Sequence, residues 1–317
     1  MTDFAGDQAL GPGLPCNLSS SDMLRDLRYR LEYLLLRLII GLVRLAPLDV
    51  SAAISARIWG FVAPRNRRHQ RALANLAIAF PEKTEAERDA IARAMWANLG
   101  RVMAETMQID RILREPDRLE ILNEPMFNRY RDKLGPAIGV SLHMGNWELA
   151  IWPMTSSGKN PAAIFRSVKN PYVDKYLRDA RKDLYPGGLL GKGHDLEESA
   201  ATARIITDYV RRGGRLGIIC DLHDNRGIPV PFFGKPAKSV AIPAIIARRQ
   251  GVRIWMARCL RVGNQSRFRI EMKELKVPRT SNQAEDVRTI TAAMQAQFEA
   301  WIRETPEQWM WGNRRWN

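Results

Sequence analysis

The hydrophobic residues change their spacing about a third of the way along the chain. Up to about residue 108 they recur every three or four positions, which is typical of amphipathic helices. The pattern predicts four helices, over 23–46, 51–63, 66–80 and 84–108. Thr84 and Glu87 have the spacing of a capping box, which supports the start of the fourth helix.

Beyond residue 135, short continuous apolar runs alternate with helical stretches. The apolar runs lie at 136–142, 162–165, 215–220 and 252–260, and a further β-like run lies at 267–271. The helical stretches lie at 147–156, 171–184, 196–212 and 239–250, with a final amphipathic helix at 284–304. This alternation predicts an α/β fold, in which a mixed, mainly parallel sheet is flanked by helices on both faces.

Residues 31–48 form a stretch rich in Leu and Ile that indicates contact with a membrane. Eighteen residues are near the lower limit for a transmembrane helix. In a spanning helix Arg37 would lie near the bilayer centre, at a cost of about 2.5–3.5 kcal/mol, whereas a helix in the membrane interface would keep Arg30, Arg37 and Arg44 in water. We therefore expect a membrane-associated helix over 22–48, either spanning or interfacial, with a core helix as the alternative.

The composition is that of an ordinary globular protein. Of the 317 residues 45% are hydrophobic and 26% charged, which excludes a disordered tail protein, a collagen-like fibre and a small disulfide scaffold. Residues 1–21 lack the basic start and apolar run of a secretory signal, so we expect a flexible tail there. One domain over 49–317 then follows the helix. The three cysteines form no CxxC pair, which suits a reducing compartment.

An excess of basic residues favours anionic partners. Lys and Arg number 49 against 34 Asp and Glu, which gives a net charge of +15. Nucleic acid, anionic lipid, a phosphorylated substrate and an acidic carrier protein would all be attracted by this charge. Nucleic-acid binding would require basic residues gathered on a recognition helix or beside stacking aromatics. Here they are dispersed, so we expect no nucleic-acid partner.

The first candidate for catalysis is the segment at residues 141–149, which reads SLHMGNWEL. His143 follows an apolar run, so it lies where a predicted strand ends and a helix begins, the usual place for chemistry in an α/β sheet. A His beside a carboxylate can act as a general base toward a hydroxyl, because the carboxylate fixes the tautomer and stabilises the imidazolium. We expect the turn at 144–146 to bring Glu148 to His143; a purely structural His is the alternative.

Two further polar residues follow predicted strands. Arg166 comes after the apolar run at 162–165, and an arginine can bind a phosphate or a developing oxyanion through paired hydrogen bonds. The basic residues between 175 and 182 are typical of a solvated helix face. Asp221 directly follows the apolar run at 215–220, and we expect it to be structural or substrate-orienting. A metal site that Asp221 shares with His223 and Asp224 is the less favoured alternative. We therefore predict no metal.

Four sequence blocks together resemble one family. They are HMGNWE at 143–148, FRSVKNP at 165–171, Asp221 with GIPVPFFGKPA at 227–237, and PEQWMWGNRRW at 306–316. In this order they are similar to the bacterial lipid A late acyltransferases, a branch of the lysophospholipid/glycerolipid acyltransferase superfamily. The likeness extends over nearly the whole chain, from about residue 24 to residue 316.

The resemblance implies an α/β acyltransferase at the cytoplasmic face of the bacterial inner membrane. Such an enzyme transfers a fatty acyl chain from acyl carrier protein to a hydroxyl of a lipid A precursor, which is an acylated, phosphorylated glucosamine disaccharide. The implied partners are acyl carrier protein, this precursor and anionic membrane lipids, and no cofactor is implied beyond the acyl donor. Transfer to another membrane lipid, such as a lysophospholipid, is the alternative.

The resemblance also assigns roles to residues. The family's catalytic His and acidic residue match His143 and Glu148. The residues expected to bind substrate are Arg166, Asn146, Asp221, Asn170 and Arg178. In the implied mechanism His143 takes the proton from the acceptor hydroxyl while Glu148 orients it, and backbone N–H groups or Arg166 stabilise the oxyanion.

Overall fold

The computed structural model describes residues 20–133, 135–192 and 196–316. The tail predicted over 1–21 therefore lies outside the described residues, except for its last two, which already belong to the first helix. The other predicted elements fall within them.

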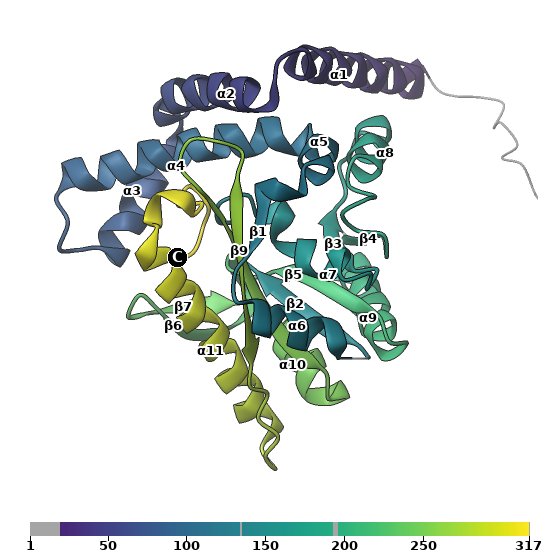
Figure 1. Ribbon diagram of the computed structural model, residues 1–317, viewed down its shortest axis with the longest axis vertical. Coiled ribbons are helices and arrows are strands. Elements are labelled where there is room, and N and C mark those ends of the chain that lie inside the picture. Colours follow the sequence, from purple (N-terminus) through teal and green to yellow (C-terminus); the bar gives the residue numbers. More distant parts are fainter. Residues whose placement is uncertain (1–19, 134, 193–195, 317) are drawn as a thin grey trace, which may run out of the picture.

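The first third of the chain is helical, as its hydrophobic spacing predicts. Its elements are α1 (Ser20–Leu45), α2 (Leu48–Val62), η1 (Ala63–Arg65), α3 (Arg67–Ala79), α4 (Glu85–Thr106), α5 (Ile109–Arg114) and η2 (Pro116–Arg118). Thr84 and Glu87 form the predicted capping box at the start of α4. Helices α1 and α2 follow one another along one side of the molecule, and α4 lies beneath α2 (Figure 1).

The rest of the chain is built on one seven-stranded sheet. Its strands are β1 (Leu119–Ile121), β2 (Ala137–Ser141), β3 (Ala162–Arg166), β4 (Leu189–Lys192), β5 (Arg215–Ile219), β8 (Arg253–Arg261) and β9 (Phe268–Leu275). They lie in the order β1-β9-β8-β2-β5-β3-β4. Only β8 and β9 pair antiparallel in this sheet, whereas the other pairs are parallel. The predicted mixed, mainly parallel sheet is confirmed.

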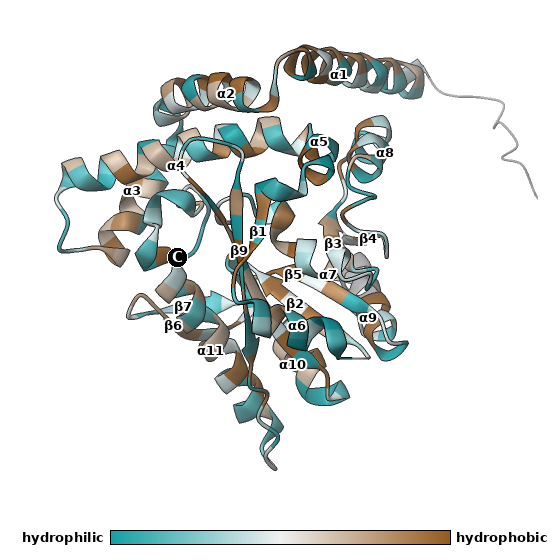
Figure 2. Ribbon diagram, viewed as in Figure 1, coloured by the Kyte–Doolittle hydropathy of each residue, from teal (hydrophilic) through white to brown (hydrophobic). Residues whose placement is uncertain are grey.

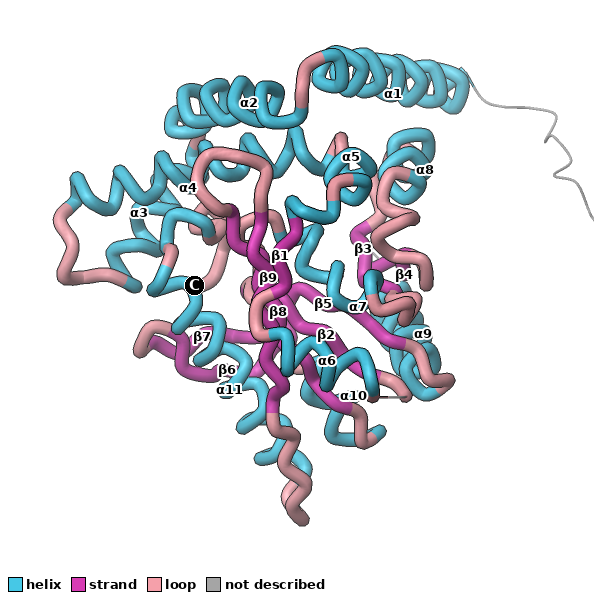
Figure 3. The backbone as a smooth tube through the Cα atoms, viewed as in Figure 1, coloured by secondary structure: helices cyan, strands magenta, loops and turns pink. Residues whose placement is uncertain are grey.

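Helices cover both faces of this sheet (Figure 3). The helices in this part of the chain are α6 (Glu124–Asp132), η3 (Trp147–Ile151), α7 (Trp152–Ser156), α8 (Pro171–Asp179), α9 (Leu196–Arg211), α10 (Ile242–Gln250), α11 (Gln283–Glu304) and η4 (Pro306–Gln308). Strand β2 shows why both faces are apolar. Ile138 and Val140 belong to one core cluster with α3, α4, α10 and α11, while Ala137 belongs to a second cluster with η3 and α7. Alternate side chains of a strand point to opposite faces, so a continuous apolar run fits a doubly covered strand.

A hairpin of β6 (His223–Phe232) and β7 (Lys235–Ser239) follows the sheet strand β5. Neither strand is among the elements predicted from the sequence, and Pro229 and Pro231 lie within β6. A two-stranded sheet tolerates them, since every strand in it has one edge free of pairing. Phe233 and Gly234 make the turn with φ of 51° and 69°, the left-handed conformation that tight hairpins require.

Helix α1 is a surface helix and not part of the core. Ile40 is its one buried residue, whereas Leu31, Leu34, Leu38 and Leu42 are each more than half exposed. Apolar and polar residues share its surface (Figure 2). The alternative of a core helix is therefore wrong. Within residues 20–133, 135–192 and 196–316, no helix is both long enough and apolar enough to cross a membrane.

Candidate active site

The adjacent parallel strands β2 and β5 bring two polar residues to the same edge of the sheet. Ser141 is opposite Ile219 in the register, and the pairing continues past the strands, because the Cys220 N–H donates to the Ser141 carbonyl at 3.1 Å. His143 and Asp221 each stand two residues beyond their strand. The carboxyl edge of a parallel sheet therefore places them side by side.

Asp221 holds His143 through two hydrogen bonds. The backbone N–H of His143 donates to Asp221 Oδ2 at 2.9 Å, and His143 Nδ1 lies 2.8 Å from Asp221 Oδ1. Trp309, from the C-terminal segment, donates its indole N–H to Oδ2 at 2.7 Å. The Asp221 side chain is fully buried, while 23% of the His143 side chain is exposed. An acceptor-only carboxylate thus fixes the imidazole on one side and leaves the ring accessible.

The buried pair shifts both pKa values in the directions expected of an ion pair. Burial alone would raise the pKa of Asp221, but the charge of His143 and hydrogen bonds from His143 and Trp309 hold it below its usual range. Burial alone would lower the pKa of His143, but Asp221, and more weakly the charge of Glu148, raise it above its ordinary value of 6.5. Asp221 is therefore ionised at neutral pH and stabilises the imidazolium.

This contact also decides which ring nitrogen of His143 can react. An ionised carboxylate only accepts hydrogen bonds, so Nδ1 carries the proton toward Asp221 in the neutral imidazole. Nε2 is then the basic nitrogen of that tautomer. The arrangement is a His–Asp dyad in which Nε2 can take a proton from a bound hydroxyl.

Glu148, which we expected beside His143, is hydrogen-bonded to Arg181 instead. The 3₁₀ helix η3 begins at Trp147, and its first turn directs Glu148 toward the residues that follow α8. Arg181 Nε and Nη2 donate to the two carboxylate oxygens at 3.0 and 2.9 Å, and both side chains are at least 85% buried. The hydrogen bond expected from Glu148 to His143 is thus made by Asp221, while the charge of Glu148 still acts on His143.

An apolar cavity of about 130 Å³ extends from the Glu148–Arg181 pair under the sheet. Its polar end includes Ser141, Glu148 and Arg181, and its apolar walls include Ile151, Met154, Phe165, Trp255 and Met272. Two strand glycines, Gly139 and Gly217, form part of the floor. A Cβ on either would come within 2.7 Å of Met154 or Ile151, so glycine lets these side chains pack against the strands.

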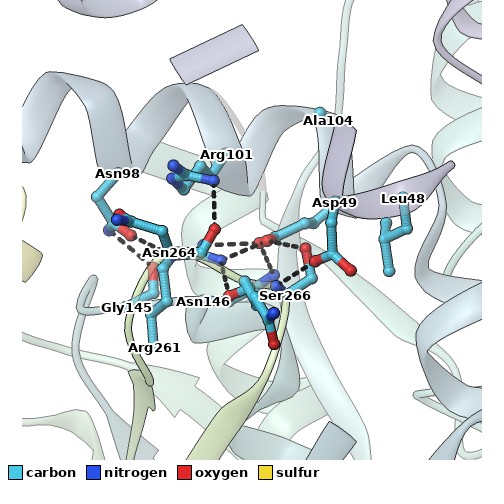
Figure 4. A network of polar contacts seen from close by, with 12 residues as sticks. Leu48, Asp49, Asn98, Arg101, Ala104, Gly145, Asn146, Arg261, Asn264 and Ser266 are labelled. Atoms are coloured by element: carbon cyan, nitrogen blue, oxygen red, sulfur yellow. Dashed lines mark hydrogen bonds and ion pairs between the residues drawn. The ribbon is translucent and has the colours of Figure 1, made fainter. Parts of the chain in front are cut away.

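The turn between His143 and Glu148 is held by a buried polar network. Asn146 donates to Glu105 of α4 at 3.0 Å, and Glu105 also accepts two hydrogen bonds from Arg261 and one from Ser266. Asn98 donates to the carbonyl of the positive-φ residue Gly145 at 3.2 Å. Figure 4 shows these groups converging on the turn from α4, β8 and the loop after β8. Asn146, predicted to bind substrate, is in this structure a buried contact of Glu105.

The other residues predicted to bind substrate lie outside the dyad and the cavity. Arg166 is exposed at the end of β3, two strands from β2 on the same edge of the sheet. Asn170 caps α8 and donates to the Tyr29 carbonyl and to Glu32 of α1. Arg178 donates to the Leu189 carbonyl, among other contacts within this part of the fold. Asn170 and Arg178 thus fasten α1, α8 and β4 together.

Neither the metal alternative nor a cysteine nucleophile finds support in the local geometry. His223 contacts Asn225, and Asp224 accepts from the Arg226 N–H; the described ranges contain no His, Cys, Asp and Glu cluster able to hold a metal. Burial raises the pKa of the Cys220 and Cys259 thiols well above the usual range, which keeps them protonated and unreactive.

Sequence reasoning missed three contributors to this site. In the sequence, Arg181 is one of several basic residues on a predicted solvated helix face. Its pairing with Glu148 depends on the chain turning after α8 ends at Asp179. Trp309 and Glu105 are 88 and 41 residues from the groups they contact. Nothing in local spacing signals such contacts, although the C-terminal PEQWMWGNRRW block points to the importance of its tryptophans.

Comparisons with known proteins agree on one class. The family model described as bacterial lipid A biosynthesis acyltransferase matches residues 19–317. The lipid A biosynthesis myristoyltransferase of Escherichia coli (strain K12) is 30% identical over 163 residues, which are 48% of each chain. Lipid A biosynthesis acyltransferase 1 of Shigella flexneri matches to the same extent. The chain thus spans about half the length of the curated relatives it matches.

Proposed function

The chain belongs to the bacterial lipid A biosynthesis acyltransferase family, and we propose that it transfers a fatty acyl chain from acyl carrier protein to a hydroxyl of an acylated, phosphorylated glucosamine disaccharide. The product is an acyloxyacyl ester on a lipid A precursor. The observation that carries this proposal is the His143–Asp221 dyad next to an apolar cavity: the ring of His143 packs against Trp147, and Trp147 lines the cavity. A base for a hydroxyl and a channel for a hydrocarbon chain are the two parts that such a transfer needs.

In the proposed reaction His143 Nε2 accepts the proton of the acceptor hydroxyl as its oxygen attacks the thioester carbonyl carbon. Asp221 keeps Nδ1 protonated and stabilises the imidazolium that forms. The tetrahedral intermediate collapses by breaking the carbon–sulfur bond. The thiolate of the carrier leaves and takes the proton back from His143. No covalent acyl-enzyme is needed, which fits the two buried, protonated cysteines.

The cavity provides the site for the acyl chain in this proposal. Glu148 and Arg181 stand at its polar end, where the thioester would lie, and the apolar walls beyond them would surround the methylene groups. Each buried CH₂ contributes about 0.8 kcal/mol, so a fatty acyl donor binds with much of its affinity from the chain. We propose that Glu148 acts on the reaction electrostatically, through Arg181 and through the pKa of His143.

The exposed apolar surface of α1 and α2 supports a location at the cytoplasmic face of the inner membrane. On α2, Ile54, Ile58 and Phe61 are at least 48% exposed and continue the leucine-rich surface of α1. Ten arginines against four acidic residues between 22 and 71 would attract an anionic leaflet, at about 1 kcal/mol for each basic residue near the surface. We propose that both helices lie in the membrane interface.

The test is an acyl-transfer assay with purified protein and acyl carrier proteins loaded with chains of different length. The acceptors are a tetra-acylated, phosphorylated glucosamine disaccharide and, in parallel, a lysophospholipid. We expect one acyl chain to be added to the disaccharide, with a preferred chain length. Transfer to the lysophospholipid alone would overturn the proposed acceptor and leave the His143 mechanism intact.

A further inference from the structure

The hydroxyl of Ser141 is buried and has no hydrogen-bond partner among the described residues. Its backbone carbonyl accepts a hydrogen bond from the Cys220 N–H, so the side-chain hydroxyl is the group without a partner. Buried polar side chains are nearly always hydrogen-bonded, and an exception in a native structure calls for an explanation. In an enzyme, a donor that is unpaired without substrate is available to a substrate.

Strand alternation places this hydroxyl on the face of β2 that lines the cavity, two residues before His143 in the chain. Ser141 lines the cavity, as does Gly139 two residues earlier on the same face of β2. Leu142 belongs to the core cluster on the opposite face, and His143 follows it, two residues beyond the end of β2. The ring of His143 packs against Trp147, which also lines the cavity, with 5.3 Å between ring centroids.

The expected oxyanion donor, Arg166, does not lie at this position. It is exposed at the end of β3, whereas the cavity is lined by its neighbour Phe165. Arg181 does line the cavity, but two of its nitrogens donate to Glu148 and the third donates to the Leu177 carbonyl. The Ser141 hydroxyl, in contrast, makes no hydrogen bond to any described residue.

We propose that Ser141 is a catalytic residue that donates a hydrogen bond from its hydroxyl to the carbonyl oxygen of the acyl thioester. The bond strengthens as that oxygen becomes the oxyanion of the tetrahedral intermediate, and it is strongest where the negative charge is greatest. Ser141 neither gains nor loses a proton; the proton moves from the acceptor hydroxyl to His143 and then to the thiolate. This inference rests on the proposed acyl transfer.

The first test is Ser141→Ala, measured by steady-state kinetics and thermal unfolding. Removal of one oxyanion donor lowers kcat by about 100-fold, and we expect the KM for the acyl donor to rise by no more than about fivefold, because the weaker ground-state bond is of the size of one neutral hydrogen bond. The melting temperature should stay constant or rise, since the variant removes an unpaired buried hydroxyl. A merely structural serine would give the opposite result, a loss of stability with kcat preserved.

The matched control is Ser157→Ala at the end of α7. The Ser157 hydroxyl is also in a partly buried position, but it donates to the Met154 carbonyl at 2.8 Å. We expect this variant to keep kcat. The proposal is overturned if Ser141→Ala retains kcat within twofold of the wild type, or if its kcat falls only in step with its melting temperature.

A second measurement does not depend on turnover. Calorimetric titration compares two unreactive donor analogues: an amide, which keeps the carbonyl, and a thioether, which lacks it. Ser141→Ala should weaken amide binding by about fivefold, the equivalent of one neutral hydrogen bond, and leave thioether binding unchanged. Equal effects on both analogues would overturn the role of Ser141, whereas failure of both to bind the wild type would contradict the proposed acyl donor itself.

Discussion

At the scale of single residues, the basicity of His143 depends on two carboxylates, Asp221 and Glu148, and on where each lies relative to the imidazole ring. Asp221 contacts Nδ1 directly, while Glu148 acts across space and is neutralised in part by Arg181. The sequence places His143 and Asp221 at strand ends, and both positions are confirmed. It does not show that the strands are neighbours, so the choice between two carboxylates for the Nδ1 contact could not be made before the fold was known.

The first residue-scale prediction concerns the pH dependence of kcat/KM. The neutral form of His143 is the base, and its pKa is raised above 6.5, so the acid limb of the profile should lie above pH 6.5. Asp221→Asn removes the main charge that raises this pKa, so the limb should move to lower pH, and kcat should fall because the tautomer is no longer fixed. Glu148→Gln should move it less. An unmoved limb in Asp221→Asn would contradict the assignment.

A second residue-scale prediction concerns the cavity floor. A Cβ on Gly139 would come within 2.6 Å of the flexible end of Met154, which must then move into the cavity. We expect Gly139→Ala to shift the preferred acyl donor toward shorter chains and to leave the dyad unaffected. Competition between donors of different length measures the shift, with Gly158→Ala as a control for stability alone. An unchanged chain-length preference would show that the acyl chain lies elsewhere.

At the scale of elements, the active-site turn depends on α4 as much as on its own strand. The periodicity of 84–108 predicts α4 as an amphipathic helix, and its capping box is confirmed. Periodicity treats Glu105 as one more polar position, yet this residue is fully buried and paired with Arg261. Contacts between segments 156 residues apart depend on the tertiary fold, and no local pattern carries them.

The element-scale prediction follows from this network. Glu105→Gln leaves the buried guanidinium of Arg261 without a charged partner, which lowers the free energy of unfolding by about 3–5 kcal/mol. It also weakens the hydrogen bond that Asn146 donates to residue 105. Both the melting temperature and kcat should fall, the latter by about tenfold or more because the turn carries His143. Asp286→Asn is the matched control, since it breaks the buried pair with Arg248 between α10 and α11. If both variants lose kcat equally, general destabilisation explains the effect.

At the scale of the whole molecule, the exposed apolar residues of α1 and α2 and the charge of +15 both fit the proposed contact with an anionic membrane surface. Helix α1 rests on α8 through Asp26 and Tyr172 and on α5 through Arg44 and Asp110, so its leucines face away from the core. The sequence predicted a membrane-associated helix without its orientation. The borderline length of the apolar stretch did not decide between a spanning and an interfacial helix. The contacts with α8 and α5 hold α1 along the surface of the domain, and this orientation favours the interfacial position.

The first whole-molecule prediction is that membrane binding depends on this surface. Leu34→Asp combined with Leu38→Asp should release the protein from vesicles containing anionic lipid, because two exposed apolar anchors of α1 are replaced by repelled charges. Co-sedimentation measures the bound fraction. Ile205→Asp, at an apolar position on α9 that is also more than half exposed, should bind vesicles as the wild type does. Release of both variants would place the binding surface elsewhere or attribute it to charge alone.

The most direct measurement of the central claim is the turnover of His143→Ala with acyl carrier protein as the donor and the phosphorylated disaccharide as the acceptor. General-base catalysis contributes about 10²–10⁴-fold, and His143 is the accessible member of the dyad. We predict that kcat falls by at least 100-fold while the protein stays folded and still binds the thioether analogue. Turnover near the wild-type value would contradict the mechanism, because the other carboxylate near the cavity, Glu148, is paired with Arg181 through both of its oxygens.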